Sequence, residues 1–240
     1  MTRNRWALLL AAVSLVLNLT RIDVAPDIHG DEIMYYQAGT SVAREGRLAW
    51  LENVPVWVHP PLFFLTEAAV VTFLPEDVDI FHGIHVVRGV GAVFGALTTA
   101  ALFLLVAGAF GVRAGIFAAG LFLLDPFVLR ICRRIMLESQ MQFFLVAGLL
   151  VVQRAGERLT WGRGAAAAVL FGLALLTKEI ALFAAGSVFV HALLARSRAL
   201  VLGSVAVLAG AVIVWSAYPV WAAATGQWEE LRAAKWLGAE

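Results

Sequence analysis

Cysteine is almost absent from this 240-residue sequence, which contains only Cys132. A single cysteine cannot form an intramolecular disulfide or supply a zinc or iron–sulfur site that needs several thiolates. We therefore expect Cys132 to be an apolar filler. An excess of charge of one sign is also missing, since 18 basic residues stand against 17 acidic ones and give a net charge of +1. Without a broad basic field, nucleic-acid binding is excluded as the main function.

Charged residues of either sign are scarce, at 15% of the chain, whereas 61% of residues are hydrophobic. The mean hydropathy is +0.85. This composition predicts an all-α polytopic membrane protein rather than a soluble domain. At the N-terminus, Arg3 and Arg5 precede an apolar run, as in a signal peptide, but no small-x-small cleavage site follows. We interpret the run as an uncleaved signal anchor with its N-terminus in the cytoplasm.

Seven apolar runs approach the roughly 20 residues that are needed to cross about 30 Å of hydrocarbon. An eighth run, 61–74, is short and carries Glu67, so we expect it to lie in the membrane interface. If 61–74 does not cross, the basic connections fall on the same side as the N-terminus, as the positive-inside tendency requires. The runs after the first are 84–107, 113–130, 138–154, 163–177, 180–195 and 199–221, and the basic connections hold Arg113, then Arg154, Arg158 and Arg163, then Arg196 and Arg198.

Placing these basic connections on the side of the N-terminus predicts one module over residues 1–240, with seven spans and a long first outer loop at about residues 22–83. The loop holds ten of the seventeen acidic residues. Within it, "DEIMYYQAGTSVAREG" predicts an amphipathic helix that starts at Asp31 and ends at Gly46. The residues alone leave two interpretations of Asp31 open: a simple helix cap or a functional carboxylate.

One outer connection, "RICRRIMLESQ", is basic although the charge rule places such residues inside. Either the topology is inverted, or Arg133 and Arg134 are retained to bind an anionic headgroup, because guanidinium groups match phosphate oxygens. Glu138 lies at the mouth of the same connection, and Arg88, Lys178 and Glu179 lie at the ends of other spans on the same side. Each of these alone could simply snorkel to the membrane surface, but their convergence beside the acidic loop favours a binding site.

A histidine and two tyrosines are further candidates for binding phosphate or sugar, and small residues are candidates for helix packing. His59 precedes two prolines in "WVHPPLFF" and could donate a hydrogen bond to phosphate. Tyr35 and Tyr36 could pack against a sugar, although aromatic residues are common at membrane interfaces. The small residues of the spans, such as Gly91 and Gly95, predict close helix packing.

Four segments in this order, "GDEIMYYQAG", "HPPL", "RRIMLESQMQFF" and "GLALLTKE", resemble the GT-C superfamily of lipid-linked-sugar glycosyltransferases. The most similar branch, the glycosyltransferase 39-like one, includes protein O-mannosyltransferases and aminoarabinose transferases that modify lipid A. The resemblance extends over essentially the whole chain. It implies a GT-C module of about seven transmembrane helices, with juxtamembrane helices in the first outer loop. Family members usually continue with more spans or a soluble domain, so a further part after residue 240 is expected.

The resemblance also implies roles for individual residues. The catalytic acid of the family falls on Asp31, with Glu32 beside it, and the acid of its second motif falls on Glu138. The family's basic positions fall on Arg88, Arg133 and Lys178. The implied reaction transfers a sugar from a polyprenyl phosphate donor, undecaprenyl or dolichyl, to an acceptor on the extracytoplasmic side.

We therefore expect Asp31 to be the general base of an inverting transfer, with Glu32 orienting the acceptor or raising the proton affinity of Asp31. The donor phosphate is expected to bind Arg88, Arg133, Arg134, Lys178 and, more weakly, His59. No cofactor is expected, and a divalent metal held by Asp31 and Glu138 is the less favoured alternative. The competing functions are a polyprenyl-lipid flippase and a non-catalytic module that binds donor lipid.

The expected partners are the polyprenyl-phosphate-linked sugar, membrane lipids and an acceptor hydroxyl or phosphate. The acceptor is left open between a glycolipid, a polysaccharide and a protein. The expected location is the plasma membrane of a bacterium, with the site facing the periplasm or exterior.

Overall fold

The computed structural model describes the whole chain except residues 1, 25, 51–53, 157–158 and 238–240. Its described part is almost entirely helical. The elements are α1 (Arg3–Leu19), α2 (Gly30–Glu45), β1 (Ala49–Trp50), β2 (Val54–Pro55), α3 (Leu62–Val71), α4 (Ile80–Phe110), α5 (Val112–Leu124), α6 (Pro126–Cys132), α7 (Leu137–Ala155), α8 (Trp161–Thr177), α9 (Ala181–Leu194), α10 (Arg198–Trp215), α11 (Ala217–Ala224), α12 (Trp228–Arg232) and a π-helical turn (Ala233–Leu237). The two short strands pair antiparallel, with Trp50 opposite Val54.

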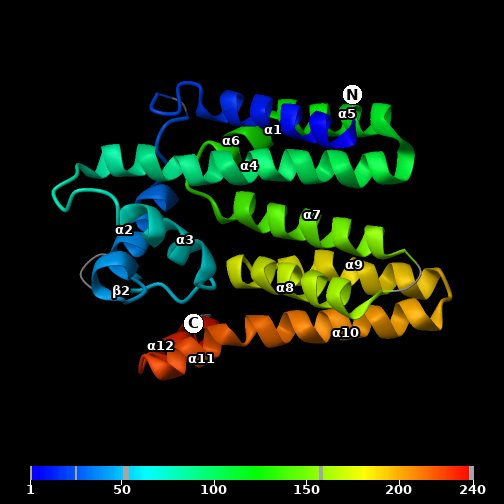
Figure 1. Cartoon of the computed structure of the whole chain (residues 1–240). Helices are drawn as coiled ribbons and strands as arrows, with labels where there is room; N and C mark the ends of the chain where they lie inside the picture. Colours follow the sequence, from blue (N-terminus) through cyan, green and yellow to red (C-terminus); the bar gives the residue numbers. More distant parts are fainter. Residues whose placement is uncertain (1, 25, 51–53, 157–158, 238–240) are drawn as a thin grey trace.

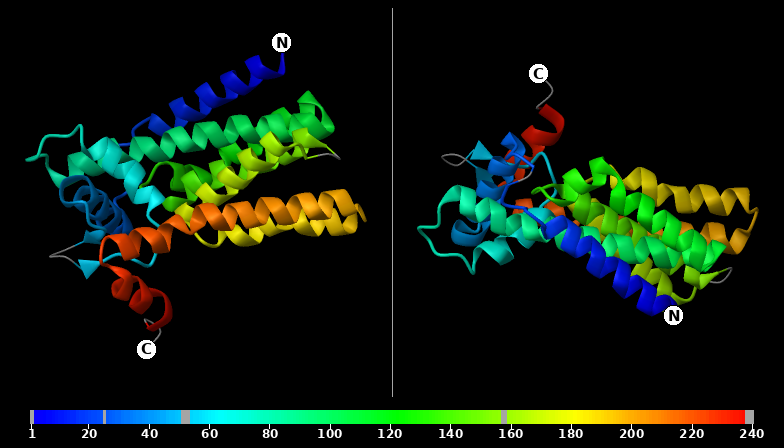
Figure 2. Two further views of the ribbon diagram at one scale, coloured as in Figure 1. Left: turned by 60° about the horizontal axis from the view of Figure 1, so that its bottom comes forward. Right: turned by 90° about the horizontal axis from the view of Figure 1, so that it is seen from above.

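The long helices lie side by side in a bundle, and the most extensive contacts are between α1 and α4, α4 and α7, α7 and α8, and α8 and α10 (Figures 1 and 2). Small residues allow the close approach that the sequence predicted. A Cβ atom on Gly91 would lie 2.8 Å from the carbonyl oxygen of Arg134, and one on Gly95 would lie 2.7 Å from Cys132 Sγ. Cys132 is 1% exposed, so it fills the interior as expected.

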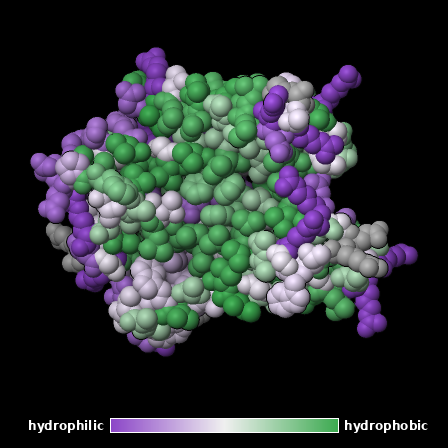
Figure 3. All heavy atoms as spheres, viewed as in Figure 1, coloured by the Kyte–Doolittle hydropathy of each residue, from purple (hydrophilic) through white to green (hydrophobic). Residues whose placement is uncertain are grey.

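A wide apolar surface covers the middle of the bundle, and hydrophilic residues gather at its two ends (Figure 3). Among the described residues, Ile80–Phe110 and Arg198–Ala224 are each long and apolar enough to cross a membrane, and a bent helix pair would make a third. Shorter apolar helices are Leu62–Val71, Trp161–Thr177 and Ala181–Leu194. The count of seven spans stays a prediction.

The predicted run 113–130 is not one straight helix. It breaks at Asp125 and bends by 68° between α5 and α6. The Asp125 carboxylate accepts hydrogen bonds from the N–H groups of Phe127 and Val128 at 2.8 and 3.0 Å. Pro126 occupies the first position of α6, where its missing N–H costs nothing. An N-cap followed by proline therefore starts a new helix inside an apolar run.

The two ends of the bundle differ, as the charge pattern predicted. One end of the bundle holds the start of α1 and the connections α4–α5, α7–α8 and α9–α10 (Figure 1). These segments carry the basic residues from which the number of spans was predicted. The other end is covered by α2, α3, the two strands and α11–α12 (Figures 1 and 2). Helix α3, which matches the predicted interfacial run 61–74, packs mainly against α2.

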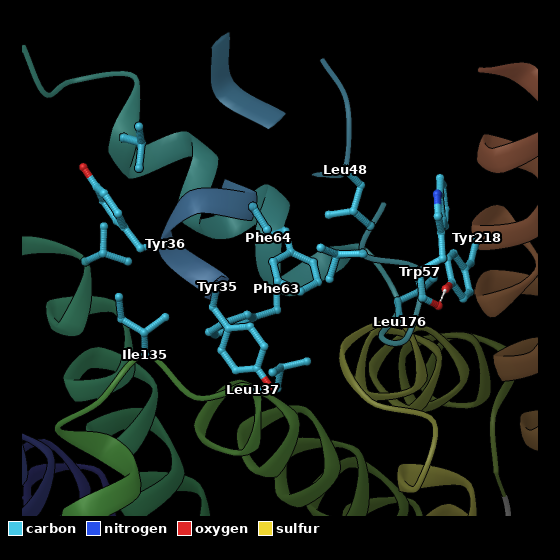
Figure 4. Close-up of a cluster of buried hydrophobic side chains, with 14 of the residues drawn as sticks. Tyr35, Tyr36, Leu48, Trp57, Phe63, Phe64, Ile135, Leu137, Leu176 and Tyr218 are labelled. Carbon is cyan, nitrogen blue, oxygen red and sulfur yellow. Dashed lines mark hydrogen bonds between the residues drawn. The ribbon is translucent and has the colours of Figure 1, made fainter. Parts of the chain in front are cut away.

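Helix α2 matches its predicted bounds to within one residue, but its cap differs from the prediction. The N-cap is His29, and Asp31 lies in the first turn, so Asp31 is not the cap. Gly46 ends the helix in the left-handed conformation at φ 68°, which glycine adopts without steric cost. The core beneath α2 is aromatic and includes Tyr35, Phe63 and Phe64 (Figure 4).

Candidate active site

Asp31 and Glu32 are adjacent in sequence but occupy opposite environments. At the start of α2, His29 Nδ1 accepts the Asp31 N–H at 3.3 Å, and Glu32 Oε2 accepts the His29 N–H at 3.0 Å, which forms a capping box. The Asp31 side chain is 53% exposed and lies 3.6 Å from His29 Nδ1. Asp31 is therefore the carboxylate of the pair that an incoming group can reach.

Glu32 is fully buried, and its carboxylate is saturated. Oε1 accepts from Arg88 Nε at 2.9 Å and from the Ile135 N–H at 3.0 Å, while Oε2 accepts from Arg88 Nη2 at 2.9 Å. The carboxylate thus joins α2, α4 and the connection between α6 and α7. We revise the expected role of Glu32, because a carboxylate enclosed in this way cannot orient an acceptor.

Three arginines predicted to bind phosphate instead hold the segment that follows α1. Arg88 is completely buried, and Arg88, Arg133 and Arg134 all donate to backbone carbonyl oxygens of residues 20–27. The bonds are Arg88 Nη1 to Ile22 at 2.8 Å, Arg133 Nη2 to Thr20 at 2.5 Å and to Arg21 at 3.2 Å, and Arg134 Nη2 to Asp27 at 2.8 Å. These contacts supply donors to backbone carbonyl groups of an irregular segment whose described residues have no regular helix or strand to pair them. Arg88 has no exposed donor for a phosphate, so its expected role is revised.

Glu138 and Lys178 form an ion pair at 2.5 Å between Oε1 and Nζ. Glu138 lies in the first turn of α7, and Lys178 is the C-cap of α8, so each charge is favoured by the dipole of its own helix. The short connection makes α7 and α8 antiparallel, which brings these two helix ends together. The side chains are 30% and 28% exposed, so both remain accessible.

Tyr35 and His59 belong to a cluster in which the charges of α2, α7 and the end of α8 act together. The Tyr35 hydroxyl lies 3.4 Å from His59 Nε2. Burial, and then the carboxylates of Asp31 and Glu138, raise the pKa of Tyr35, so acids from α2 and α7 act on the same hydroxyl. Burial, followed by the cations Lys178 and Lys235, lowers the pKa of His59 and favours the neutral imidazole.

The two tyrosines do not present open faces to a sugar. The Tyr35 ring makes edge contacts with Phe63 and Phe64, with centroids 5.9 and 5.8 Å away. Tyr36 points away from Tyr35 (Figure 4) and lies over α4, where a Cβ on Gly83 would be 2.0 Å from the Tyr36 hydroxyl oxygen. We therefore assign Tyr36 to helix packing, because it is 5% exposed.

Residues near the C-terminal end of the chain also reach the cluster, and sequence reasoning missed them. Lys235 Nζ contacts Glu179 Oε2 at 2.5 Å and the Val58 carbonyl oxygen at 2.8 Å. The Tyr218 hydroxyl donates to the Trp57 carbonyl oxygen at 2.6 Å. The sequence identified Lys178 and Glu179 as charged residues at the end of a span, but no local pattern linked them to Lys235.

A metal site is not evident in the part of the chain that the structure describes. No group of three or more His, Cys, Asp or Glu side chains there could hold a metal ion. Glu138, one of the two ligands considered, is already paired with Lys178. Chemistry without a metal stays a prediction.

A family model described as dolichyl-phosphate-mannose-protein mannosyltransferase matches residues 59–222, which is more than half of the chain. The chain belongs to this family. The matched region contains His59, Arg88, Glu138 and Lys178, and Asp31 precedes it. No curated protein matches the chain in sequence.

Two solved structures share the fold of this family member. The protein O-mannosyltransferase Pmt1–Pmt2 complex of S. cerevisiae, bound to the sugar donor, matches with a TM-score of 0.74 and 19% identity over 95% of this chain and 34% of that one. ArnT from Cupriavidus metallidurans, bound to undecaprenyl phosphate, matches with a TM-score of 0.66 and 21% identity over 91% of this chain and 42% of that one. The GT-C resemblance is thereby confirmed, and the chain is an integral membrane protein. It spans less than half the length of either relative.

Proposed function

We propose that this chain is the membrane module of a glycosyltransferase that moves a sugar from a polyprenyl phosphate donor to an acceptor. The observation that carries the proposal is the exposed carboxylate of Asp31 together with the accessible Glu138–Lys178 pair, in a chain of the mannosyltransferase family. Asp31 and Glu138 both act on the hydroxyl group of Tyr35. The donor is supported by the two related structures, one of which is bound to a sugar donor and the other to undecaprenyl phosphate.

In the proposed reaction, the acceptor hydroxyl attacks the anomeric carbon from the side opposite the phosphate, and Asp31 takes its proton. The bond between the anomeric carbon and the phosphate oxygen breaks, and the configuration at the anomeric carbon is inverted. Lys178 is the best placed cation for the departing phosphate, which would compete with Glu138 for the ammonium group. Neutral His59 adds one hydrogen-bond donor.

The remaining arginines position this site rather than act in it. Arg88, Arg133 and Arg134 hold the segment 20–27, and Glu32 holds the start of α2 through Arg88. No metal takes part in this proposal. The site is proposed to face the exterior of a bacterial plasma membrane, because the connections α4–α5, α7–α8 and α9–α10, with the basic residues that the positive-inside tendency places inside, lie at the opposite end of the bundle.

The test uses undecaprenyl phosphate linked to radiolabelled mannose, with native membranes as the source of acceptor. Asp31→Asn is expected to lower the release of undecaprenyl phosphate by roughly 100-fold or more, the range for loss of a general base. Glu45→Gln is the matched control, because Glu45 is an exposed acid at the other end of the same helix. Full turnover by Asp31→Asn would refute the assignment of the base.

The same assay separates the alternatives. A module that only binds donor lipid would retain the labelled lipid but release no undecaprenyl phosphate in any variant. A flippase would move the intact lipid between leaflets of a vesicle. Neither the unmodified protein nor Asp31→Asn would then break the bond between sugar and phosphate.

A further inference from the structure

The end of the bundle away from the candidate active site contains two adjoining cavities. The first, here called the apolar groove, has a volume of about 570 Å³ and lies between α4, α7, α9 and α10, with Leu105, Leu149, Val188 and Leu200 in its walls. The second, here called the basic cleft, has a volume of about 280 Å³ and is lined by Arg3, Asn4, Leu104, Gly108, Gln153 and Arg154. The cavities therefore differ in character but share a boundary.

Gln153 forms that boundary, since it lines both cavities. Its Nε2 donates to the Leu105 carbonyl oxygen at 2.8 Å, which fixes the amide against α4. The contact depends on a glycine, because a Cβ on Gly108 would lie 2.9 Å from Gln153 Oε1. The junction between the groove and the cleft is thus a defined contact between α4 and α7.

The basic cleft attracts an anion. Arg3 and Arg154 line it, and Arg163 Nη1 donates to the Arg154 carbonyl oxygen at 2.8 Å, which brings a third guanidinium group nearby. The described residues at these helix ends include no aspartate or glutamate. Arginine side chains at the end of a membrane bundle bind lipid phosphate readily, because the charge of the membrane surface attracts them and their guanidinium groups match phosphate oxygens.

The apolar groove, by contrast, suits a hydrocarbon chain. Its walls are mainly aliphatic and include Leu105, Leu149, Val152, Val188 and Leu200. An amphipathic molecule with one anionic headgroup and at least one acyl chain matches both cavities at once. A soluble anion would fill only the cleft, and a neutral lipid would leave the arginines without a partner.

We propose that the groove and the cleft together bind one anionic phospholipid, with its phosphate at Arg3 and Arg154 and an acyl chain between α7 and α9. The lipid belongs to the membrane leaflet opposite the candidate active site. It is therefore distinct from the polyprenyl donor, whose phosphate reacts at the other end of the bundle. Its binding ties α1, α4, α7 and α9 together where the connections between helices are short.

The first test is native mass spectrometry of the full chain released from nanodiscs that contain equal amounts of phosphatidylglycerol and phosphatidylcholine. The unmodified protein should retain phosphatidylglycerol preferentially. Arg3→Gln with Arg154→Gln should lower bound phosphatidylglycerol by about tenfold or more. The control is Arg113→Gln with Arg198→Gln, which removes the same charge from the same end but from neither cavity.

A second pair of variants tests the groove independently of charge and of the fold around the arginines. Ser187→Phe fills the groove and should lower bound phosphatidylglycerol at least fivefold, whereas Val190→Phe on the same helix should not. Equal retention of the two phospholipids, or unchanged binding in both the charge and the filling variants, would overturn the proposal. So would the finding that polyprenyl phosphate is the lipid displaced by these substitutions.

Discussion

Arg88 is expected to stabilise the fold, because it is fully buried and donates two hydrogen bonds to the buried Glu32. Arg88→Ala leaves that carboxylate without its main partner, which typically costs about 3–5 kcal/mol of unfolding free energy. We expect the melting temperature in detergent to fall by roughly 10 °C. Arg113→Ala removes an exposed arginine and should leave it nearly unchanged. Equal melting of the two variants would show that the pair does not hold α2 to α4.

A second residue, Glu67, is an acid placed where its charge is unfavourable. It is fully buried on α3, and neither carboxylate oxygen has a hydrogen-bond partner among the described residues. Burial, followed by the charge of Glu32, raises the pKa of Glu67 well above 4.5, so the folded protein keeps a proton that the unfolded chain loses.

Glu67 therefore lowers stability as pH rises above about 4.5, by about 1.4 kcal/mol per pH unit up to the pKa of the folded state. Glu67→Gln removes this dependence, so its melting temperature should exceed that of the unmodified protein at pH 8 and approach it near pH 4.5. Glu45→Gln, an exposed acid, should show no such trend. A constant difference between Glu67→Gln and the unmodified protein across this pH range would contradict the interpretation.

At this scale the sequence identified residue types better than partners. Arg133 and Arg134 were recognised as basic residues on an unexpected side, but the carbonyl groups of residues 20–27 that they bind carry no side-chain signal. A backbone acceptor looks the same at every position of a sequence. Arg133 and Arg134, which were predicted to bind phosphate, therefore hold the segment after α1.

Among the elements, α4 packs closely against the end of α6 and the connection that follows it. A Cβ on Gly91 would lie 2.8 and 2.9 Å from the carbonyl oxygens of Arg134 and Cys132, and backbone atoms cannot move as cheaply as side chains. We expect Gly91→Ala to cost about 1–3 kcal/mol, the usual range for overpacking.

The control for this prediction lies on the same helix. A Cβ on Gly89 meets no atom within 4 Å, so Gly89→Ala should be neutral or slightly stabilising. Thermal melting of both variants, together with the release of undecaprenyl phosphate, measures the effect. Similar values for Gly91→Ala and Gly89→Ala would mean that the connection is not held against α4.

The elements themselves were largely predictable. The bounds of α2 followed from its periodicity and from Gly46, and α4, α7, α8 and α9 followed from apolar length. The break between α5 and α6 was missed, although Asp125 and Pro126 mark it, because hydrophobicity alone does not register a cap followed by proline. The pair Glu138 and Lys178 followed from convergence of helix ends on one side.

At the scale of the whole molecule, the connections α4–α5, α7–α8 and α9–α10 lie at one end, and the candidate site lies at the other with the connection between α6 and α7 (Figure 1). The proposed orientation predicts different labelling of two single-cysteine proteins made in a Cys132→Ser background. Ser41→Cys on α2 should react with a membrane-impermeant maleimide on intact cells. Thr160→Cys, at the start of α8, should react only after the membrane is opened. The reverse pattern would invert the proposed orientation.

At this scale the sequence did not reveal which segments far apart in the chain contact each other. Lys235 reaches Val58 and Glu179, and Tyr218 reaches Trp57, through contacts between segments far apart in the chain. Periodicity and charge parity place helices relative to a membrane, but they contain no information about which distant side chains meet. The related solved structures support the fold, and the contacts of this chain support the proposed site.

The contact of Lys235 with Val58 and Glu179 has a consequence for biosynthesis. Asp31 and His59 leave the ribosome early, whereas Lys178, Glu179 and Lys235 follow only after most helices have been made. Burial lowers the pKa of His59 and the two lysines lower it further, but these lysines are absent from a nascent chain. The cluster forms when the C-terminal segment docks, so a partly synthesised protein carries the acid of the site without its cations.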